Sequence, residues 1–317
     1  MNNVDKQYLD LMRDIMENGV KKQTRAGAVR SIFGRMLRFN LKDGLPILTT
    51  KKVFSRGCTE ELLWFLSGST NIKYLVERDV HIWDDDAYRY YNTLKNEWGG
   101  LGDLTKEEFI EDVKKNHVYI LQNKKNPMEA ITYTAGDLND VYGKQWRSFG
   151  VSGRDQIADV IDKLKNSPDD RRMLVVAFNP DVLDKVALPP CHVMFQFYTK
   201  ELPNGKRELS CMWSQRSVDC CLGLPYNLLS YSELTHMIAQ CCDMEVGEIL
   251  CSLGDVHIYE NQIDGVMEQL QNDPTKYDLP KLELNPNIKN IDDFTIDDIK
   301  IVGYESYPKI YFPLSVG

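Results

Sequence analysis

The stretch from residue 186 to residue 231 constrains the fold of this 317-residue chain more than any other. Two consecutive prolines precede Cys191 and hold the backbone in a stiff turn, because proline fixes φ. Residues 193–200 have the β-branched and aromatic composition of a strand, and residues 203–205 (Pro-Asn-Gly) are a strong hairpin signal. A return strand is predicted over 208–217, so the hairpin brings its far end back toward Cys191.

That far end is polar where a buried strand should stay apolar, with Gln215, Arg216, Ser217 and Asp219 in close succession. Each residue taken alone has an ordinary structural interpretation: a cysteine is most often a small buried hydrophobe, and an arginine is usually solvated. Five polar groups of different chemistry around one strand end favour a functional site. A direct Cys-His dyad is not expected at Cys191-His192, because neighbours on a strand point to opposite faces.

Composition indicates a soluble globular protein, with 43% hydrophobic and 27% charged residues. The net charge of −9 argues against a general nucleic-acid-binding protein, so nucleic acid is not expected as the main ligand. Eight cysteines without a CxxC pair and a polar, acidic N-terminus favour a reduced, cytoplasmic setting. Five scattered histidines give no convincing metal site, and no apolar run is long enough to span a membrane.

Hydrophobic periodicity predicts helices alternating with strands, which is typical of an α/β (α+β) chain. We expect a basic loop over 21–30, a strand over 31–41, and a helix that Thr59 caps, with Glu61 in its first turn. Residues 104–123 have an amphipathic helical pattern. Further helices are expected over 4–16, 71–78, 155–164, 228–242 and 260–271, and further strands over 173–178 and near residues 281 and 300.

Four sequence blocks resemble the active-site blocks of the thymidylate synthase family: LPPCH (188–192), QRSxD (215–219), LGLPYN (222–227) and GDVHIY (254–259). The resemblance runs from about residue 8 to residue 316. It implies a large mixed β-sheet flanked by helices, with the sheet packing across a homodimer. It also implies a single catalytic domain over 1–317, with a helical insertion at about 87–137.

The resemblance assigns roles to individual residues. The catalytic set would be Cys191, Glu61, Tyr142, His192, Asn227 and Asp219. The substrate-binding set would be Arg25, Arg171, Arg172, Gln215, Arg216, Ser217, Asp219, Asn227, His257 and Tyr259, with Arg171 and Arg172 donated across the dimer interface. The cofactor-binding set would be Lys51, Ile82, Trp83, Leu188, Asp219, Leu222, Gly223, Tyr226 and Val316, with no metal.

The implied reaction is the reductive methylation of dUMP to dTMP. Cys191 would add to carbon 6 of the base and so make carbon 5 nucleophilic. The co-substrate 5,10-methylenetetrahydrofolate would supply the one-carbon unit and then a hydride, leaving dihydrofolate. Arg216 would raise the thiolate fraction of the cysteine and bind the phosphate.

Two other functions stay open at this stage. A dUMP or dCMP hydroxymethylase would use the same folate with water in place of hydride. It is favoured by departures from the family pattern at Asp86, Ser214, Gly317 and the shortened loop around Arg25, whereas Asn227 suits a uracil and favours the synthase. A non-catalytic nucleotide- or RNA-binding relative is disfavoured by the intact catalytic set.

Overall fold

The computed structural model describes residues 3–315, which form two compact units. The first unit comprises Met1–Leu63, Asp155–Val176 and Cys191–Gly317. The second comprises Trp64–Arg154 and Ala177–Pro190. Within the described residues, no helix has both the length and the apolar character needed to cross a membrane.

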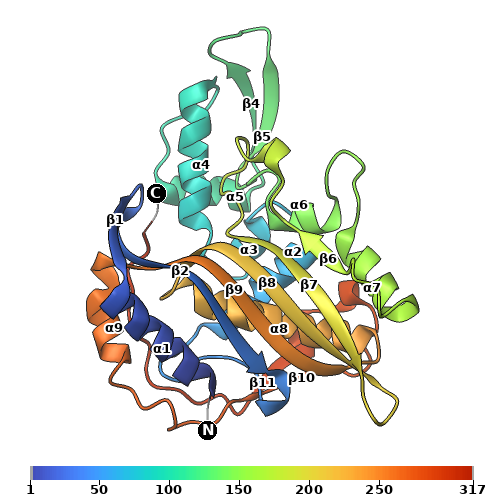
Figure 1. Cartoon of the computed structure of the whole chain (residues 1–317). Helices are drawn as coiled ribbons and strands as arrows, with labels where there is room; N and C mark the ends of the chain where they lie inside the picture. The colour runs from blue at the N-terminus through green and yellow to red at the C-terminus, as the bar shows by residue number, and fades with distance from the viewer. Residues whose placement is uncertain (1–2, 316–317) are drawn as a thin grey trace. The chain divides into compact units, whose positions relative to one another are not determined.

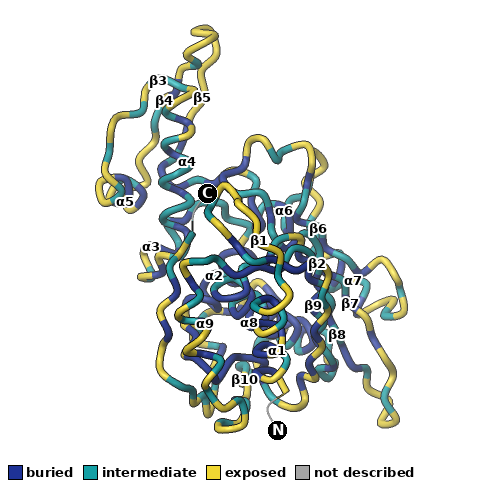
Figure 2. Tube along the Cα trace, turned by 60° about the vertical axis from the view of Figure 1, so that its left-hand side comes forward, coloured by how far each residue is buried: buried dark blue, intermediate teal, exposed yellow. Residues whose placement is uncertain are grey.

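A six-stranded mixed sheet forms the centre of the first unit, as the family resemblance implies (Figure 1). Its strand order is β1-β2-β9-β8-β7-β6, and β8 and β9 run parallel while all other neighbours are antiparallel. The strands are β1 (Val20–Thr24), β2 (Gly27–Asn40), β6 (Leu174–Val176), β7 (His192–Glu201), β8 (Arg207–Asp219) and β9 (Glu245–Tyr259). The β7–β8 hairpin turns at the predicted residues, and its tip is exposed (Figure 2).

Two helices, α1 (Asn3–Asn18) and α8 (Gly223–Cys241), cover one face of this sheet. Arg35 of β2 pairs with Asp14 of α1 at 2.5 Å, and Trp213 of β8 stacks on Tyr231 of α8 with ring centroids 4.9 Å apart. The α8 helix is buried nearly all round, as its apolar sequence predicts. The remaining elements of the unit are α2 (Ser55–Leu66, which ends in the second unit), α7 (Gln156–Asn166), α9 (Ile263–Gln269), β10 (Lys281–Leu284), β11 (Ile299–Val302) and the 3-10 turns Leu41–Asp43, Glu260–Gln262, Ile291–Asp293 and Ile296–Asp298.

One residue in each of three adjacent strands takes no part in the pairing between them: Gly34 of β2, Gly254 of β9 and Arg216 of β8. These three residues form a skipped line across the sheet. Glycine is required at 254, because a Cβ there would lie 2.8 Å from the carbonyl oxygen of Arg216. Along β9 the buried side chains change parity at this line, from Leu253 before it to Val256 after it. The register is the same before and after this line, so the change of parity alone alters which side chains at the ends of β8 and β9 face the helices.

A buried carboxylate fixes the segment that leads to Lys51. Asp5 of α1 is fully buried and accepts four hydrogen bonds of 2.5–2.9 Å, from the backbone N–H and the hydroxyl of both Thr49 and Thr50. Buried charges are retained in proteins where such donors satisfy them. The N-terminal helix therefore sets the path of residues 49–51.

The second unit combines short helices with a three-stranded antiparallel sheet in the order β3-β4-β5. Its elements are α3 (Lys73–Val76), α4 (Asp84–Glu97), β3 (Trp98–Gly99), α5 (Lys106–Lys114), β4 (Val118–Asn123), β5 (Ala130–Thr134), α6 (Tyr142–Arg147) and a 3-10 turn at Pro180–Val182. Tyr91, Phe109, Tyr119 and Tyr133 pack their rings together beside the small sheet, with centroids 5.0–6.5 Å apart.

The predicted helix over 104–123 is wrong in its second half. The helix α5 ends at Lys114, and Asn116 takes a left-handed φ of 54°. Residues 118–123 instead form β4, which pairs with β5. The β-branched and aromatic residues of this segment favour a strand once the helix has ended. The region expected as a helical insertion therefore contains both helices and a sheet.

Two smaller expectations also differ from the structure. The basic segment 21–30, expected as a loop, is a regular hairpin in which Thr24 pairs with Gly27. Thr59 does not cap α2, because the helix already begins at Ser55. The Thr59 hydroxyl instead lies 3.2 Å from the carbonyl oxygen of Ser55, and Glu61 lies inside the helix.

Candidate active site

The hairpin brings Cys191 and Arg216 together, as the sequence predicts. His192 pairs with Gln215 across β7 and β8, and the backbone N–H of Arg216 donates a 2.8 Å hydrogen bond to the carbonyl oxygen of Cys191. Cys191 is half-buried, and none of the eight cysteines, all of which lie among the described residues, forms a disulfide. The stiff turn before Cys191 and the skipped line at Arg216 therefore place a thiol and a guanidinium-bearing residue at the same edge of the sheet.

His192 is buried on the side of the sheet that α8 covers. Its Nδ1 lies 2.7 Å from the hydroxyl of Tyr231, and burial lowers the pKa of His192 to about 3. The ring is therefore neutral at physiological pH. In that state it contributes to the site as a hydrogen-bonding group.

A chain of side-chain hydrogen bonds connects β8 to the N-terminal part of α8. Trp213 donates through Nε1 to Oε1 of Gln215 at 3.2 Å, and Gln215 donates through Nε2 to Oδ1 of Asn227 at 3.1 Å. The indole N–H fixes which end of the Gln215 amide is oxygen, and this in turn orients Asn227. Gln215 and Asn227, predicted separately, are thus parts of one network.

Asp219 closes β8 and ties it to the start of α8. Its Oδ1 accepts hydrogen bonds from the backbone N–H groups of Cys221 and Leu222 at 2.8 and 2.9 Å, and Oδ2 accepts one from Gln262 at 3.3 Å. These bonds satisfy donors near the helix start, where Leu222 immediately precedes Gly223. Asp219 therefore has a structural role whether or not it also contacts a ligand.

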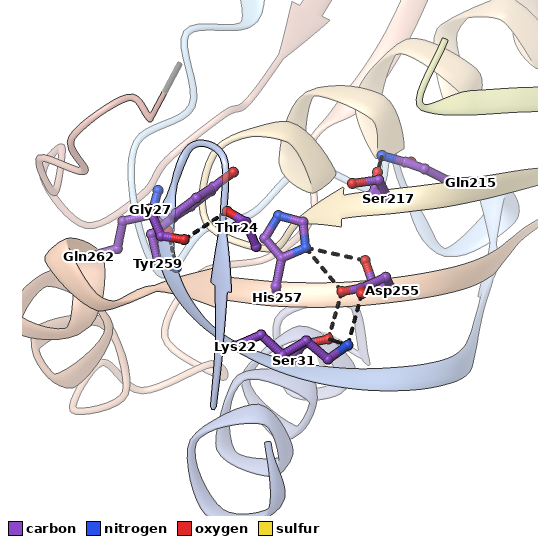
Figure 3. Close-up of polar contacts among 10 residues, drawn as sticks. All are labelled: Lys22, Thr24, Gly27, Ser31, Gln215, Ser217, Asp255, His257, Tyr259 and Gln262. Carbon is purple, nitrogen blue, oxygen red and sulfur yellow. Dashed lines mark hydrogen bonds and ion pairs between the residues drawn. The ribbon is translucent and has the colours of Figure 1, made fainter. Parts of the chain in front are cut away.

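His257 and Tyr259 face the same side of β9, as their spacing predicts, with ring centroids 5.3 Å apart (Figure 3). Burial raises the pKa of Tyr259, and nearby acidic groups, first among them Asp219, raise it further. Tyr259 and Asp219 therefore lie near one another, at the ends of the neighbouring strands β9 and β8. Ser217 lies nearby, since it pairs with the residue two before His257 on β9.

Glu61 approaches the site from α2. The thiol of Cys58 donates to the carbonyl oxygen of Tyr226 at 3.1 Å. Burial raises the pKa of Tyr226, and the negative charge of Glu61 adds to the increase. The carboxylate of Glu61 therefore lies near Tyr226, which directly precedes Asn227 in α8.

Three arginines predicted to bind phosphate are exposed. Arg25 lies at the tip of the β1–β2 hairpin. Arg171 and Arg172 lie between α7 and β6, and Arg172 pairs with Asp170 through two contacts of 3.1 Å. Their exposure leaves all three side chains accessible to an anion.

Lys51 is buried, in contrast to these arginines. Its ammonium donates to the carbonyl oxygen of Cys221 and lies 4.3 Å from the ring centroid of Phe312. Burial lowers the pKa of Lys51. It therefore sits behind the start of α8, near the residues predicted to bind the folate.

The predicted residues of the second unit include an aromatic cluster. Trp83 lies 6.3 Å from Tyr142 between ring centroids, and Phe65 lies 4.9 Å from Tyr142. Ile82 and Leu188 are half-buried in the same unit. Val316 lies outside the described residues.

Sequence reasoning gave no role to Asp255, although the block that contains it was singled out. The carboxylate lies beside the ring of His257, at 3.4 Å from Nδ1. The available signal was spacing: residues two apart on a strand face the same side, which places Asp255 next to His257. Its partners on β1 and β2 cannot be found this way, because they depend on strand pairing.

The mixed sheet presents a cysteine and an arginine from one hairpin, an arrangement that suits nucleophilic catalysis by a thiolate. The sequence model of the family described as "Thymidylate synthase" matches residues 6–316. The chain belongs to the thymidylate synthase family. The described residues contain no cluster of His, Cys, Asp or Glu that could hold a metal ion.

Two plant relatives are similar along nearly the whole chain. The "Bifunctional dihydrofolate reductase-thymidylate synthase" of Zea mays is 43% identical over 322 residues, which cover 98% of this chain and 54% of the maize protein. The "Putative bifunctional dihydrofolate reductase-thymidylate synthase" of Oryza sativa subsp. japonica is 44% identical, over 98% of this chain and 57% of the rice protein. The chain thus spans about half the length of these curated relatives.

Proposed function

We propose that the chain is a thymidylate synthase, which converts dUMP to dTMP with 5,10-methylenetetrahydrofolate and releases dihydrofolate. The observation that carries the proposal is the 2.8 Å hydrogen bond between the backbones of Arg216 and Cys191. This main-chain bond supports the proposal that the half-buried thiol of Cys191 works together with the Arg216 side chain in a chain of this family.

The role proposed for the Cys191 thiol is to activate carbon 5 of the base. Carbon 5 of uracil is a poor nucleophile, and addition of the Cys191 thiolate to carbon 6 makes carbon 5 an enolate carbon. A guanidinium close to the thiol raises its thiolate fraction, and the same group forms charge-assisted hydrogen bonds with a phosphate. Arg216 would serve both purposes.

The other residues would position the nucleotide. Arg25, Ser217 and, from across a dimer interface, Arg171 and Arg172 of the partner subunit would bind the phosphate. Gln215 would orient Asn227, whose amide can both donate to and accept from the uracil edge. His257 and Tyr259 would hold the sugar hydroxyl. Glu61, Tyr142 and His192 would order water that moves protons, with His192 neutral throughout.

The reduced folate would supply the one-carbon unit and then the hydride. Asp219 suits recognition of a pterin ring, because backbone N–H groups already hold its carboxylate in one orientation. Trp83 offers an aromatic surface, and Lys51 a buried ammonium. The other residues proposed to contact the folate are Ile82, Leu188, Leu222, Gly223, Tyr226 and Val316.

A turnover assay tests this function. Purified chain with dUMP and 5,10-methylenetetrahydrofolate should produce dihydrofolate absorbance and a nucleotide heavier by one methyl substitution. The second candidate, a hydroxymethylase, is favoured by Asp86, which pairs with Arg89 at 2.8 Å where the family often has a second tryptophan. A product heavier by one further oxygen, formed without dihydrofolate, would establish that candidate and refute the synthase.

The uncovered sheet face supports the proposal that the protein is a homodimer. On the face opposite α1 and α8, Met36 is 60% exposed and Tyr198 is 67% exposed, and Met194, Met212 and Leu250 are only half-buried. These apolar side chains lie among polar ones such as Arg38 and Gln196 on the same face, and a mixture of this kind suits a protein–protein interface. Self-association would also bring Arg171 and Arg172 to the partner's phosphate site.

Replacing Met36 with lysine should convert a dimer into monomers of 36.6 kDa. An unpaired charge buried in an interface costs about 3 kcal/mol or more, which weakens association at least about 100-fold. The matched control is Val20→Lys, because Val20 is 62% exposed on the edge strand β1 of the same sheet. Sedimentation should show monomers for Met36→Lys and dimers for Val20→Lys. Equal masses for the two variants would contradict the interface.

We also propose that residues 1–317 act as a single catalytic domain, with the insertion at about 87–137 as an accessory lobe, and that the protein is cytoplasmic. The half-buried thiol of Cys191 supports a reducing location, since the proposed chemistry needs that sulfur unoxidised.

A further inference from the structure

A polar network lies behind His257 and is contributed by three adjacent strands (Figure 3). Ser31 of β2 donates from its hydroxyl to Oδ1 of Asp255 at 2.6 Å. Lys22 of β1 donates to Oδ2 of Asp255 at 3.1 Å and lies 3.3 Å from the Ser31 hydroxyl. Lys22 can reach β9 because β1 and β2 form a regular hairpin in which Val20 pairs with Ser31, and Ser31 in turn pairs with His257.

The network faces only one nitrogen of the imidazole. Nδ1 of His257 lies 3.3 Å from the carbonyl oxygen of Asp255 and 3.4 Å from its Oδ1. A backbone carbonyl can only accept a hydrogen bond, and an ionised carboxylate also only accepts. Nδ1 must therefore carry a hydrogen, and a neutral ring then has its lone pair on Nε2.

The charge state of Asp255 is held by its donors. Burial alone would raise the pKa of this carboxyl group, but the hydrogen bonds from Ser31 and Lys22 lower it below its ordinary value overall. The group is therefore a carboxylate at neutral pH. It receives hydrogen bonds from Lys22 and Ser31 while its Oδ1 faces Nδ1 of His257, so every contact is between a donor and an acceptor.

We propose that Lys22, Ser31 and Asp255 are positioning residues that fix His257 as its Nδ1-protonated tautomer, so that Nε2 accepts a hydrogen bond from the 3′-hydroxyl of the nucleotide. The proposal deepens the proposed function and rests on it for the identity of the ligand. A ring that can only accept selects nucleotides whose 3′ group is a hydrogen-bond donor. A nucleotide without that hydroxyl leaves the buried acceptor unpaired, and a 3′-phosphate presents a second acceptor.

The ring can be tested without turnover. Nitrogen-15 NMR of the full-length protein, with the His257 signals assigned by their loss in His257→Gln, should show a protonated Nδ1 and an unprotonated Nε2. The tautomer is observed in the ligand-free protein, so this measurement stands even if dUMP is not a substrate. An Nε2-protonated ring would overturn the proposal.

Kinetics then separates positioning from general damage to the fold. Lys22→Met should raise KM for dUMP about tenfold with little change in kcat, because one oriented hydrogen bond is weakened. Lys22→Arg should restore most of the loss. With 3′-deoxy-dUMP, wild type and Lys22→Met should have the same kcat/KM, since the hydroxyl that the network serves is missing.

The matched control is Lys21→Met, the neighbouring exposed lysine on β1, whose side chain points to the other face of the strand. It should leave both nucleotides unaffected. An equal loss on dUMP and 3′-deoxy-dUMP in Lys22→Met would overturn the positioning role. Absence of dUMP turnover in the wild type would instead refute the proposed synthase, and the NMR result would still decide the tautomer.

Discussion

Replacing Cys191 with serine is expected to lower kcat for dTMP formation by at least about 10³-fold, because an alcohol at this position is almost never ionised near neutral pH. The side chain is half-buried, and the main-chain bond from Arg216 to Cys191 does not involve the sulfur. The variant should therefore fold and still bind dUMP. Turnover is measured by dihydrofolate absorbance, and binding by calorimetry.

Cys242→Ser is the matched control for that prediction. Cys242 is also half-buried, and it lies just after α8, far along the chain from the β7–β8 hairpin. It should keep wild-type turnover. Mass spectrometry of acid-quenched mixtures should find a nucleotide bonded to the wild-type and Cys242→Ser proteins and none bonded to Cys191→Ser. Full turnover by Cys191→Ser would refute the covalent mechanism.

The second large effect concerns stability and comes from Glu233 of α8. This carboxyl group is fully buried, and burial raises its pKa to about 8. Its Oε1 lies 2.9 Å from the hydroxyl of Thr59, which also contacts the carbonyl oxygen of Ser55. One hydroxyl hydrogen cannot serve both acceptors, so a protonated Glu233 that donates to Thr59 completes the network.

The sign of the pH dependence follows from that raised pKa. An unfolded glutamate titrates near its ordinary value of 4.5, whereas the folded group keeps its proton up to about pH 8. Between these values the native state binds one more proton than the unfolded state, so the free energy of unfolding falls as pH rises. The loss in the free energy of unfolding that Glu233 causes is absent below about pH 4.5 and reaches the order of 5 kcal/mol by pH 8.

Glu233→Gln keeps the shape of the side chain and removes its titration. We expect this variant to be markedly more stable than wild type at pH 8 and to lose most of the decline in stability between pH 5 and pH 8. Urea unfolding at several pH values and one protein concentration measures this difference. Glu17→Gln, an exposed position on α1, should keep the wild-type pH profile. Parallel profiles for wild type and Glu233→Gln would show that Glu233 is ionised in the native protein.

The parts of the fold that could be predicted from sequence are those fixed by local chemistry. The turn signal at residues 203–205 predicted the hairpin that brings Cys191 close to Arg216. The spacing of His257 and Tyr259 predicted that both face the same side of their strand. The buried helix α8 followed from its apolar composition.

The parts that could not be predicted depend on contacts between distant segments. Residues 104–123 keep a helical pattern in sequence, but Asn116 ends the helix and pairing with β5 stabilises the strand that follows. Glu233 has the sequence context of an ordinary helical glutamate, and only the packing of Thr59 against it shows that it is buried. The carboxylate network of Lys22 and Asp255 exists because β1 and β9 both flank β2.

The skipped line at Gly34, Gly254 and Arg216 divides a continuous sheet into two regions that can vary independently. On one side of the line the surface opposite the helices carries methionine and leucine, such as Met212 and Leu250; on the other it carries Asp255 and His257. Inserting or deleting one residue near the line in any of these strands would turn the side chains at the end of that strand to the opposite face of the sheet, out of phase with those of the neighbouring strands. Substitutions on the other side, around Met212 and Leu250, would leave that phase intact, so the proposed subunit contacts and the proposed nucleotide site can diverge separately in evolution.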